Sequence, residues 1–413
     1  MEYSLILTVL LSFILTFVTI PSIVNVSNAK NLFDEPNRRR LNKVVVPTMG
    51  GIAIFVGSIL SAMLFLDKSS PYEFRYILIA VIMMLFIGIK DDILIIAPSK
   101  KLMVQFAAAL ILVLPGKFRI IHTYDLFSAT VLNEWISIPL SVLVILFLVN
   151  ALNLIDGIDG LAGGLTLFAS LTLGSWFMLT GHYNSAIICL AFCGSLVAFL
   201  FYNLRGGKNK IFMGDTGSLI LGVFLAAMII RFNELNYAVS SPFRFSQAPL
   251  VALALMIVPV TDTLRVFFIR IKNKRSPFSP DMNHFHHLLI KSGLSHVQAT
   301  GFMISYTIIF TMVALLGSHF QLSLSVTFPL LMALSFTAVG LIYRRTKRAT
   351  TFEATASKDN KEIHLRQIAK DVSVFTKVLP RIHEPALASH EKHLIKIRTN
   401  SAQSDRIRVA AGD

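Results

Sequence analysis

The chain has few charged residues and only two cysteines. Charged residues make up 15% of its 413 positions and hydrophobic residues 54%, and the mean hydropathy is +0.67. A soluble domain carries about 25% charged residues, so this composition excludes an ordinary soluble or disordered protein. Cys189 and Cys193 lie four residues apart in one apolar stretch, where they share a helix face, so they cannot form a secreted disulfide framework and we expect them to pack.

Long apolar runs take the place of charge. A helix needs about 20 apolar residues to cross a bilayer core, so we predict an all-α polytopic membrane protein with eleven transmembrane helices, or ten if the short fourth run does not cross. The first run has no basic segment before it, and we interpret it as a retained helix. The runs are 3–26, 48–66, 72–90, 101–115, 135–152, 161–180, 185–203, 211–230, 248–269, 299–317 and 323–343.

Basic residues lie mainly in one set of loops. These loops are 27–47, 90–101, 153–160, 203–210 and 270–298, and they hold 16 Lys and Arg residues against 6 in the other set. Basic loops face the cytoplasm, so we predict a periplasmic N-terminus and a cytoplasmic C-terminus. Residues 1–345 form the predicted transmembrane domain. Residues 346–413 form a basic cytoplasmic tail that would suit anionic lipid or a partner, with no feature that chooses between them.

Acidic and amide residues are scarce, and several lie in apolar surroundings. A carboxylate near hydrocarbon costs about 2.5 to 3.5 kcal/mol, so a recurring set indicates a function. The set is Asp91, Asp92, Asn153, Asp156, Asp159, Asp215, Asp262 and Asp281. The predicted topology brings the first six to cytoplasmic ends of spans. Asp262 lies three residues before Arg265, which favours a structural salt bridge, with Arg265 as a phosphate clamp the alternative.

Adjacent carboxylates need a partner to stay ionised near a low-dielectric region. For Asp91 and Asp92, Mg²⁺ with a phosphate ligand is one solution. A solvated pair neutralised by Lys90, Lys100 and Lys101 is the other.

The segment NALNLIDGIDGLAGG spaces Asn153, Asp156 and Asp159 three apart, so on a helix they would form a slanted polar strip. Its glycines would let a nucleotide or phosphate approach the backbone, although glycine-rich packing faces are also common in membranes. Asp215 begins a span, where an N-cap is its ordinary role and where a diphosphate and its metal would also bind. Phe212 offers an aromatic face on which the base of a nucleotide could stack.

Three histidines crowd the basic loop 270–298, namely His284, His286 and His287. Neighbouring cations oppose their protonation, and an anionic ligand would relieve that opposition. A zinc site would need a Cys or Glu that the segment lacks. Histidines that face lipid headgroups are the remaining alternative.

Five motifs occur in order on the predicted cytoplasmic side. Together they resemble the polyprenyl-phosphate N-acetylhexosamine-1-phosphate transferases of glycosyltransferase family 4, and they look closer to the undecaprenyl-phosphate GlcNAc-1-phosphate transferase branch than to the phospho-MurNAc-pentapeptide translocases, the alternative. The resemblance covers about 1–345. The motifs are PTMGG (47–51), KDD (90–92), NLIDGIDGLAGG (153–164), FMGDTGS (212–218) and SPDMNHFHHLL (279–289).

The resemblance implies transfer of HexNAc-1-phosphate from UDP-HexNAc to undecaprenyl phosphate at a bacterial inner membrane, which releases UMP and uses Mg²⁺, with Mn²⁺ an alternative. It implies no nucleic-acid partner and is compatible with a homodimer. GlcNAc is the commonest sugar of the branch. Neither the sugar nor the glycan served follows from the motifs, so O-antigen, enterobacterial-type common antigen, teichoic-acid linkage and capsule all stay open.

Roles carry over by motif position. Asp215 would hold the metal with Asp92, and Asp91 would act as a base or orient the lipid phosphate; direct attack is favoured because such a phosphate hardly needs a strong base. The implied substrate contacts are Asn153, Asp156 and Asp159 for the nucleotide sugar, Lys43 near the uracil, and His284, His286 and His287 for the diphosphate or sugar. Many relatives have His-Lys where this chain has Asn42-Lys43.

A secondary transporter is the alternative of another class, since it also places carboxylates inside the membrane. Such carboxylates usually lie near the midplane in paired repeats, whereas these lie at one face and the DGIDG segment has no repeat. A CDP-alcohol phosphotransferase would need Ala-Arg after Asp156-Gly157, where this chain has Ile158-Asp159.

Overall fold

The structure is a computed structural model that describes residues 2–30, 46–67, 72–94, 96–124, 126, 131–205, 207–240, 242–276 and 284–344. The chain divides into two units, Met1–Thr346 and Lys347–Asp413, and all described residues belong to the first. Lys43, Asp281 and the predicted tail lie outside the described residues.

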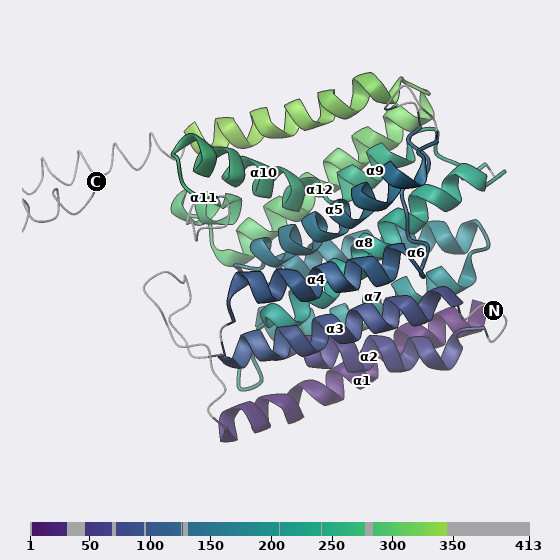
Figure 1. Cartoon of the computed structure of the whole chain (residues 1–413). Coiled ribbons are helices and arrows are strands. Elements are labelled where there is room, and N and C mark those ends of the chain that lie inside the picture. Colours follow the sequence, from purple (N-terminus) through teal and green to yellow (C-terminus); the bar gives the residue numbers. More distant parts are fainter. Residues whose placement is uncertain are drawn as a thin grey trace, which may run out of the picture. The chain divides into compact units, whose positions relative to one another are not determined.

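The described part of the chain is a bundle of helices without a strand (Figure 1). Every one of the eleven predicted apolar runs lies on helix, so the all-α expectation is confirmed. The helices are α1 (Glu2–Ala29), α2 (Gly50–Phe65), α3 (Tyr72–Leu94), α4 (Pro98–Val113), α5 (Glu134–Ile155), α6 (Leu161–Leu179), α7 (Tyr183–Arg205), α8 (Gly214–Ala238), α9 (Ala248–Leu255), α10 (Ile257–Lys272), α11 (Phe285–Lys291), α12 (His296–His319) and the helix Leu324–Arg344.

Several of these helices are long and apolar enough to make this a multi-pass membrane protein. Within the described ranges, seven helices could each cross a membrane by length and composition, or eight if α9 and α10 form one span. The helices α2, α3 and α4 fall outside that set. Eleven spans therefore stay a prediction, as does the orientation of the termini.

The predicted span 248–269 is wrong as one continuous helix. It breaks at Met256 into α9 and α10, which are bent by 73°. Pro259 has no N–H to donate to the carbonyl of Leu255 four residues earlier, so the hydrogen-bond ladder cannot continue across this point.

The centre of the bundle is α8, which packs against α2, α3, α5, α6 and α9. Glycines bring the backbones close: a Cβ on Gly222 would stand 2.8 Å from the Cα of Val149, and a Cβ on Gly88 would stand 2.3 Å from the Cα of Thr216. Small residues allow such close helix contacts in membranes. The start of α8 therefore lies beside the ends of α3 and α5.

The PTMGG segment is a backbone clamp for the start of α8. Gly50 N–H donates to the carbonyl of Phe212 at 2.9 Å, and Gly51 N–H donates to the carbonyl of Met213 at 3.0 Å. Phe212 N–H donates in return to the carbonyl of Pro47 at 2.8 Å. A Cβ on Gly51 would stand 2.2 Å from the N atom of Gly217, so only glycine permits this approach.

Candidate active site

Lys101 joins three helices at one end of the bundle. Its Nζ lies 2.9 Å from Asp91 Oδ2 and 2.8 Å from Asp215 Oδ1, and it donates to Asn153 Oδ1 at 3.2 Å. Asp91 comes from α3, Asn153 from the last turn of α5 and Asp215 from the first turn of α8. These side chains, far apart in the sequence, thus converge on a single ammonium group.

Asn153 holds the Asp215 carboxylate. Its Nδ2 donates to Asp215 Oδ1 at 2.5 Å and to Ser218 Oγ at 2.8 Å. The predicted polar strip on one helix is wrong, however, because α5 ends at Ile155. Asp156 follows as its C-cap with φ −74° and ψ 61°, and Asp159 lies in the turn before α6, so the Asp-Gly pairs end the helix rather than continue it.

Asp92 caps α8 from another helix. Its Oδ1 accepts the backbone N–H of Asp215 at 2.8 Å, while its Oδ2 accepts the N–H of Thr216 at 3.1 Å and the Thr216 hydroxyl at 2.6 Å. The first N–H groups of a helix lack partners within the helix, and the cap residue itself, Met213, supplies none. The alternative in which Asp215 is the N-cap is therefore wrong, because Asp215 is the second residue of α8.

Asp156 lies among the negative charges of Asp92, Asp159 and Asp215 at this end of the bundle. It is half-buried. Burial raises the pKa of its carboxyl to about 8, and the charges of Asp215, Asp92 and Asp159 raise it further. Asp156 is therefore mainly protonated at neutral pH. The cluster favours any ligand that brings positive charge.

Asp159 forms an ion pair with Lys210, 2.7 Å from Nζ to Oδ2. The Lys210 ammonium also lies 5.6 Å from the centroid of the Phe212 ring, and His296 Nδ1 lies 4.0 Å from Asp159 Oδ2. An aromatic face, a cation and a carboxylate thus occur together at the edge of the cluster. Neither Lys210 nor His296 belongs to a recognised motif, so neither was predicted as a site residue. Only their position near Phe212 and the histidine motif could have suggested such a role.

The histidine motif is anchored by Asp262. Its Oδ1 accepts from Arg265 Nη2 at 3.1 Å and from the N–H of Phe285 at 2.8 Å, and its Oδ2 lies 2.9 Å from His284 Nδ1. The expected salt bridge between Asp262 and Arg265 is confirmed. The same carboxylate, buried to 2% exposure, also fixes the start of α11.

His286 connects this motif to the Asp156–Asp159 loop. A Cβ on Gly157 would stand 2.3 Å from His286 Nε2, so the ring lies against that glycine. The His284 and His286 rings are near parallel, with centroids 5.7 Å apart, and those of His286 and His287 are 4.3 Å apart. Burial and the charge of His287 lower the pKa of His286 to about 3, so it is neutral at pH 7. It can exchange hydrogen bonds with a ligand but brings no charge.

Comparison with known proteins finds one family model and similar bacterial proteins. Residues 74–233 match the family model described as Glycosyl transferase family 4. A Bacillus subtilis (strain 168) protein named probable undecaprenyl-phosphate N-acetylglucosaminyl 1-phosphate transferase is 30% identical over 365 residues, which cover 85% of this chain and 98% of that protein. An Escherichia coli (strain K12) protein named undecaprenyl-phosphate alpha-N-acetylglucosaminyl 1-phosphate transferase is 29% identical over 280 residues, 66% of this chain and 73% of that protein.

Proposed function

The chain belongs to glycosyl transferase family 4, and we propose that it transfers N-acetylhexosamine-1-phosphate from UDP-N-acetylhexosamine to undecaprenyl phosphate, releasing UMP. The names of its relatives favour GlcNAc as the sugar. The observation that carries the proposal is the convergence of Asp91, Asn153 and Asp215 on Lys101, because each comes from a different motif of the family.

The reaction exchanges one phosphoanhydride bond for another. A phosphate oxygen of undecaprenyl phosphate forms a bond to the phosphorus that bears the sugar, and the bond from that phosphorus to the oxygen of UMP breaks. The nucleophile is already an anion, so no covalent enzyme intermediate is required. Asp91 would orient the lipid phosphate, and the ammonium groups of Lys101 and Lys210 would offset the charge that collects on the leaving UMP.

Mg²⁺ fits the donor set at Asp215. Among the described residues, no group of three or more His, Cys, Asp or Glu side chains could hold a metal by itself. Mg²⁺ does not need one, because it binds through one or two carboxylates and completes its shell with waters and substrate phosphates. Asp215 would be the main ligand. Asp92 already accepts three hydrogen bonds, so its first task is to hold the α8 backbone. When bound, the ion would neutralise the diphosphate.

The nucleotide sugar would lie between the Asp156–Asp159 loop and α11. Phe212 and Lys210 suit the uracil and the adjoining phosphate, and His286 offers a neutral imidazole to the sugar. Arg265 is engaged with Asp262, which favours the structural alternative over the phosphate clamp.

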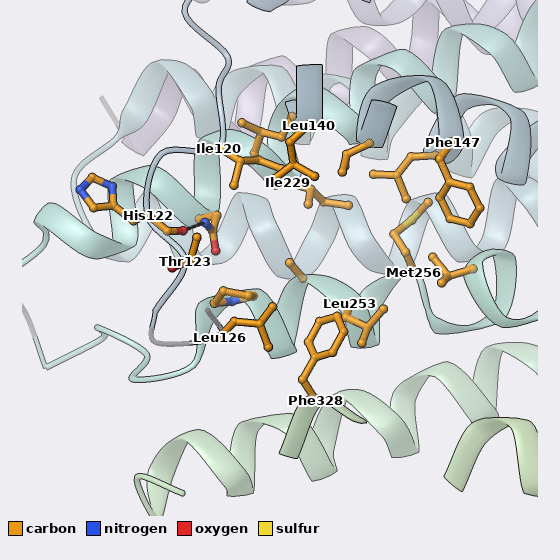
Figure 2. Close-up of a pocket in the computed structure, with 17 residues that line it drawn as sticks. Ile120, His122, Thr123, Leu126, Leu140, Phe147, Ile229, Leu253, Met256 and Phe328 are labelled. Carbon is orange, nitrogen blue, oxygen red and sulfur yellow. Dashed lines mark hydrogen bonds between the residues drawn. The ribbon is translucent and has the colours of Figure 1, made fainter. Parts of the chain in front are cut away.

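The polyprenyl chain would use the apolar pocket shown in Figure 2. This cavity of about 340 Å³ lies between α5, α8, α9 and the helix Leu324–Arg344. Its α5 lining ends at Phe147 and Leu148, roughly 8 Å along the helix from Asn153 at 1.5 Å per residue. Met256, at the break between α9 and α10, lines the pocket on the same side as Phe147 (Figure 2). A phosphate near Asn153 would therefore leave its chain within reach of the pocket.

The cytoplasmic side of a bacterial inner membrane is the proposed place of the active site. Basic loops at this end of the bundle support it. The two native cysteines, Cys189 and Cys193, are buried. In a background without them, a single exposed cysteine at position 291 should react with an impermeant maleimide only in inverted vesicles. A cysteine at position 321, at the other end of α12, should react only in right-side-out cells, and the reverse result would overturn the orientation.

Transfer is tested with the full-length protein in detergent, undecaprenyl phosphate, Mg²⁺ and a panel of labelled UDP-sugars. Label from UDP-GlcNAc should enter lipid with release of UMP. Asp215→Asn should lower this rate at least a hundredfold. Glu134→Gln, which also replaces a carboxylate by an amide but at an exposed site, should not. Label from only UDP-MurNAc-pentapeptide would support the peptidoglycan alternative, and no lipid label from any sugar nucleotide would refute the proposal.

A further inference from the structure

Lys101 is more enclosed than a neutralising loop lysine would be. Its side chain is 13% exposed, and its Nζ contacts Asp91, Asn153 and Asp215 at 2.8 to 3.2 Å. The neighbouring Lys100 is on the same helical turn but exposed. The two lysines therefore carry the same charge in different surroundings.

The contact with Asp215 uses the oxygen that a metal would need. A carboxylate oxygen can accept along two lone-pair directions. Asp215 Oδ1 already accepts from Lys101 Nζ at 2.8 Å and from Asn153 Nδ2 at 2.5 Å. A divalent cation bound to Oδ1 must take the place of the ammonium. A cation bound to Oδ2 would instead stand a few ångströms from it, where like charges repel strongly because the site is partly desolvated.

We propose that Lys101 competes with the divalent cation for Asp215, and that a substrate phosphate relieves the competition by attracting the ammonium. The inference rests on the proposed function, since it takes Asp215 as the metal ligand. Lys101 keeps Asp91 as a partner when it leaves Asp215, so the ammonium stays in the site and is available to phosphate.

This competition couples two binding events. Metal binding at Asp215 frees Lys101 for phosphate, and phosphate binding withdraws Lys101 from Asp215, so each ligand raises the affinity of the other by the same factor. The site then holds the metal weakly until the substrate arrives. Asp91 and Asp215 each keep a counter-ion at every stage.

The test is Mn²⁺ binding by the purified full-length protein in detergent, followed by electron paramagnetic resonance without any activity readout. Lys101→Met removes the charge and keeps the length, and it should lower the Kd for Mn²⁺ about tenfold. Lys100→Met is the matched control and should change the Kd less than twofold. Lys101→Arg keeps the charge and should resemble the wild type. A Lys101→Met Kd equal to or above that of the wild type would overturn the competition.

UMP supplies the second measurement. It should lower the Kd for Mn²⁺ more in the wild type than in Lys101→Met, since only the wild type has a competitor to withdraw. An equal effect in both proteins would refute the coupling. Asp215→Asn separates the two levels: if it bound Mn²⁺ as the wild type does, the metal assignment of the proposed function would fail, whereas its loss of binding with an unaltered Lys101→Met would remove only the competition.

Discussion

The Asp92 carboxylate accepts the backbone N–H of Asp215 at 2.8 Å, so the end of α3 caps the start of α8. The acidic pair of the KDD motif is thereby divided. Asp91 turns to Lys101 and to the N–H of Ile96 at 2.8 Å, while Asp92 serves α8. Two adjacent aspartates thus avoid mutual repulsion because each has donors of its own.

Thr216→Val tests whether this cap positions the reacting groups. The change keeps the side-chain shape and removes the 2.6 Å hydrogen bond to Asp92, which should lower stability by about 1 kcal/mol and slow transfer at least tenfold. Thr216→Ser should retain both properties. Thermal melting in detergent and UMP release measure the two effects.

Thr311→Val is the matched control, because that hydroxyl donates within α12 to the carbonyl of Thr307. It should leave the transfer rate unchanged. Equal rates for Thr216→Val and Thr311→Val would show that the cap has no part in the activity.

Gly157→Ala tests the contact between the histidine motif and the Asp156–Asp159 loop. The added Cβ would stand 2.3 Å from His286 Nε2, so the ring and α11 must shift, and we expect transfer to fall at least tenfold. Gly301→Ala, on α12 with open space around it, should be neutral or stabilise by about 0.5 to 1 kcal/mol.

His286→Ala would remove the obstructing ring. If Gly157→Ala slowed transfer equally with and without His286, the damage would come from the loop backbone and not from this contact. A double-mutant cycle on the transfer rate decides between the two.

Sequence reasoning found the helices and the acidic residues of the site for a simple reason. Apolar runs of membrane length have few alternatives to helix, and a carboxylate near hydrocarbon stands out against its neighbours. Asp91, Asn153 and Asp215 are adjacent as expected. Because successive spans alternate in direction, counting the spans was enough to place all three at the same end of the bundle. Lys43 lies outside the described residues, and its role stays a prediction.

The sequence alone could not show which side chains meet across the packed helices. Nothing local to Asp92 indicates that it caps α8, 123 positions away, since that contact exists only after α3 and α8 pack. The break at Met256 was missed because a hydropathy profile does not report that Pro259 lacks a backbone N–H. Lys101 was counted as a general neutralising charge because its burial depends on which face of α4 meets α3 and α5.

Asp262 supports the histidines, and its removal should show this. Asp262→Ala leaves Arg265 and His284 without their shared acceptor, and breaking a buried charged pair costs about 3 to 5 kcal/mol. Asp262→Asn should be milder, because its Oδ1 can still accept from the N–H of Phe285. Melting in detergent ranks the two variants, and UMP release from the folded fraction of Asp262→Asn should stay below a tenth of the wild-type rate. A wild-type rate for Asp262→Asn would mean that the orientation of His284 is unimportant.

Asp156 predicts how stability changes with pH. Its folded pKa is raised from 3.8 to about 8, so the folded protein keeps a proton that the unfolded chain has lost between those two values. Stability should therefore fall as pH rises from about 4 towards 8, by about 1.4 kcal/mol per pH unit from this group, and become level above its folded pKa. Asp156→Asn is neutral at every pH and should lack this contribution. The melting temperature of Asp156→Asn should accordingly rise relative to the wild type between pH 5.5 and 8. Glu134→Gln, an exposed change at the other end of α5, should follow the wild-type curve. Parallel curves for Asp156→Asn and the wild type would show that Asp156 is ionised in the folded protein at neutral pH, and the negative cluster would then need a permanent cation beside it.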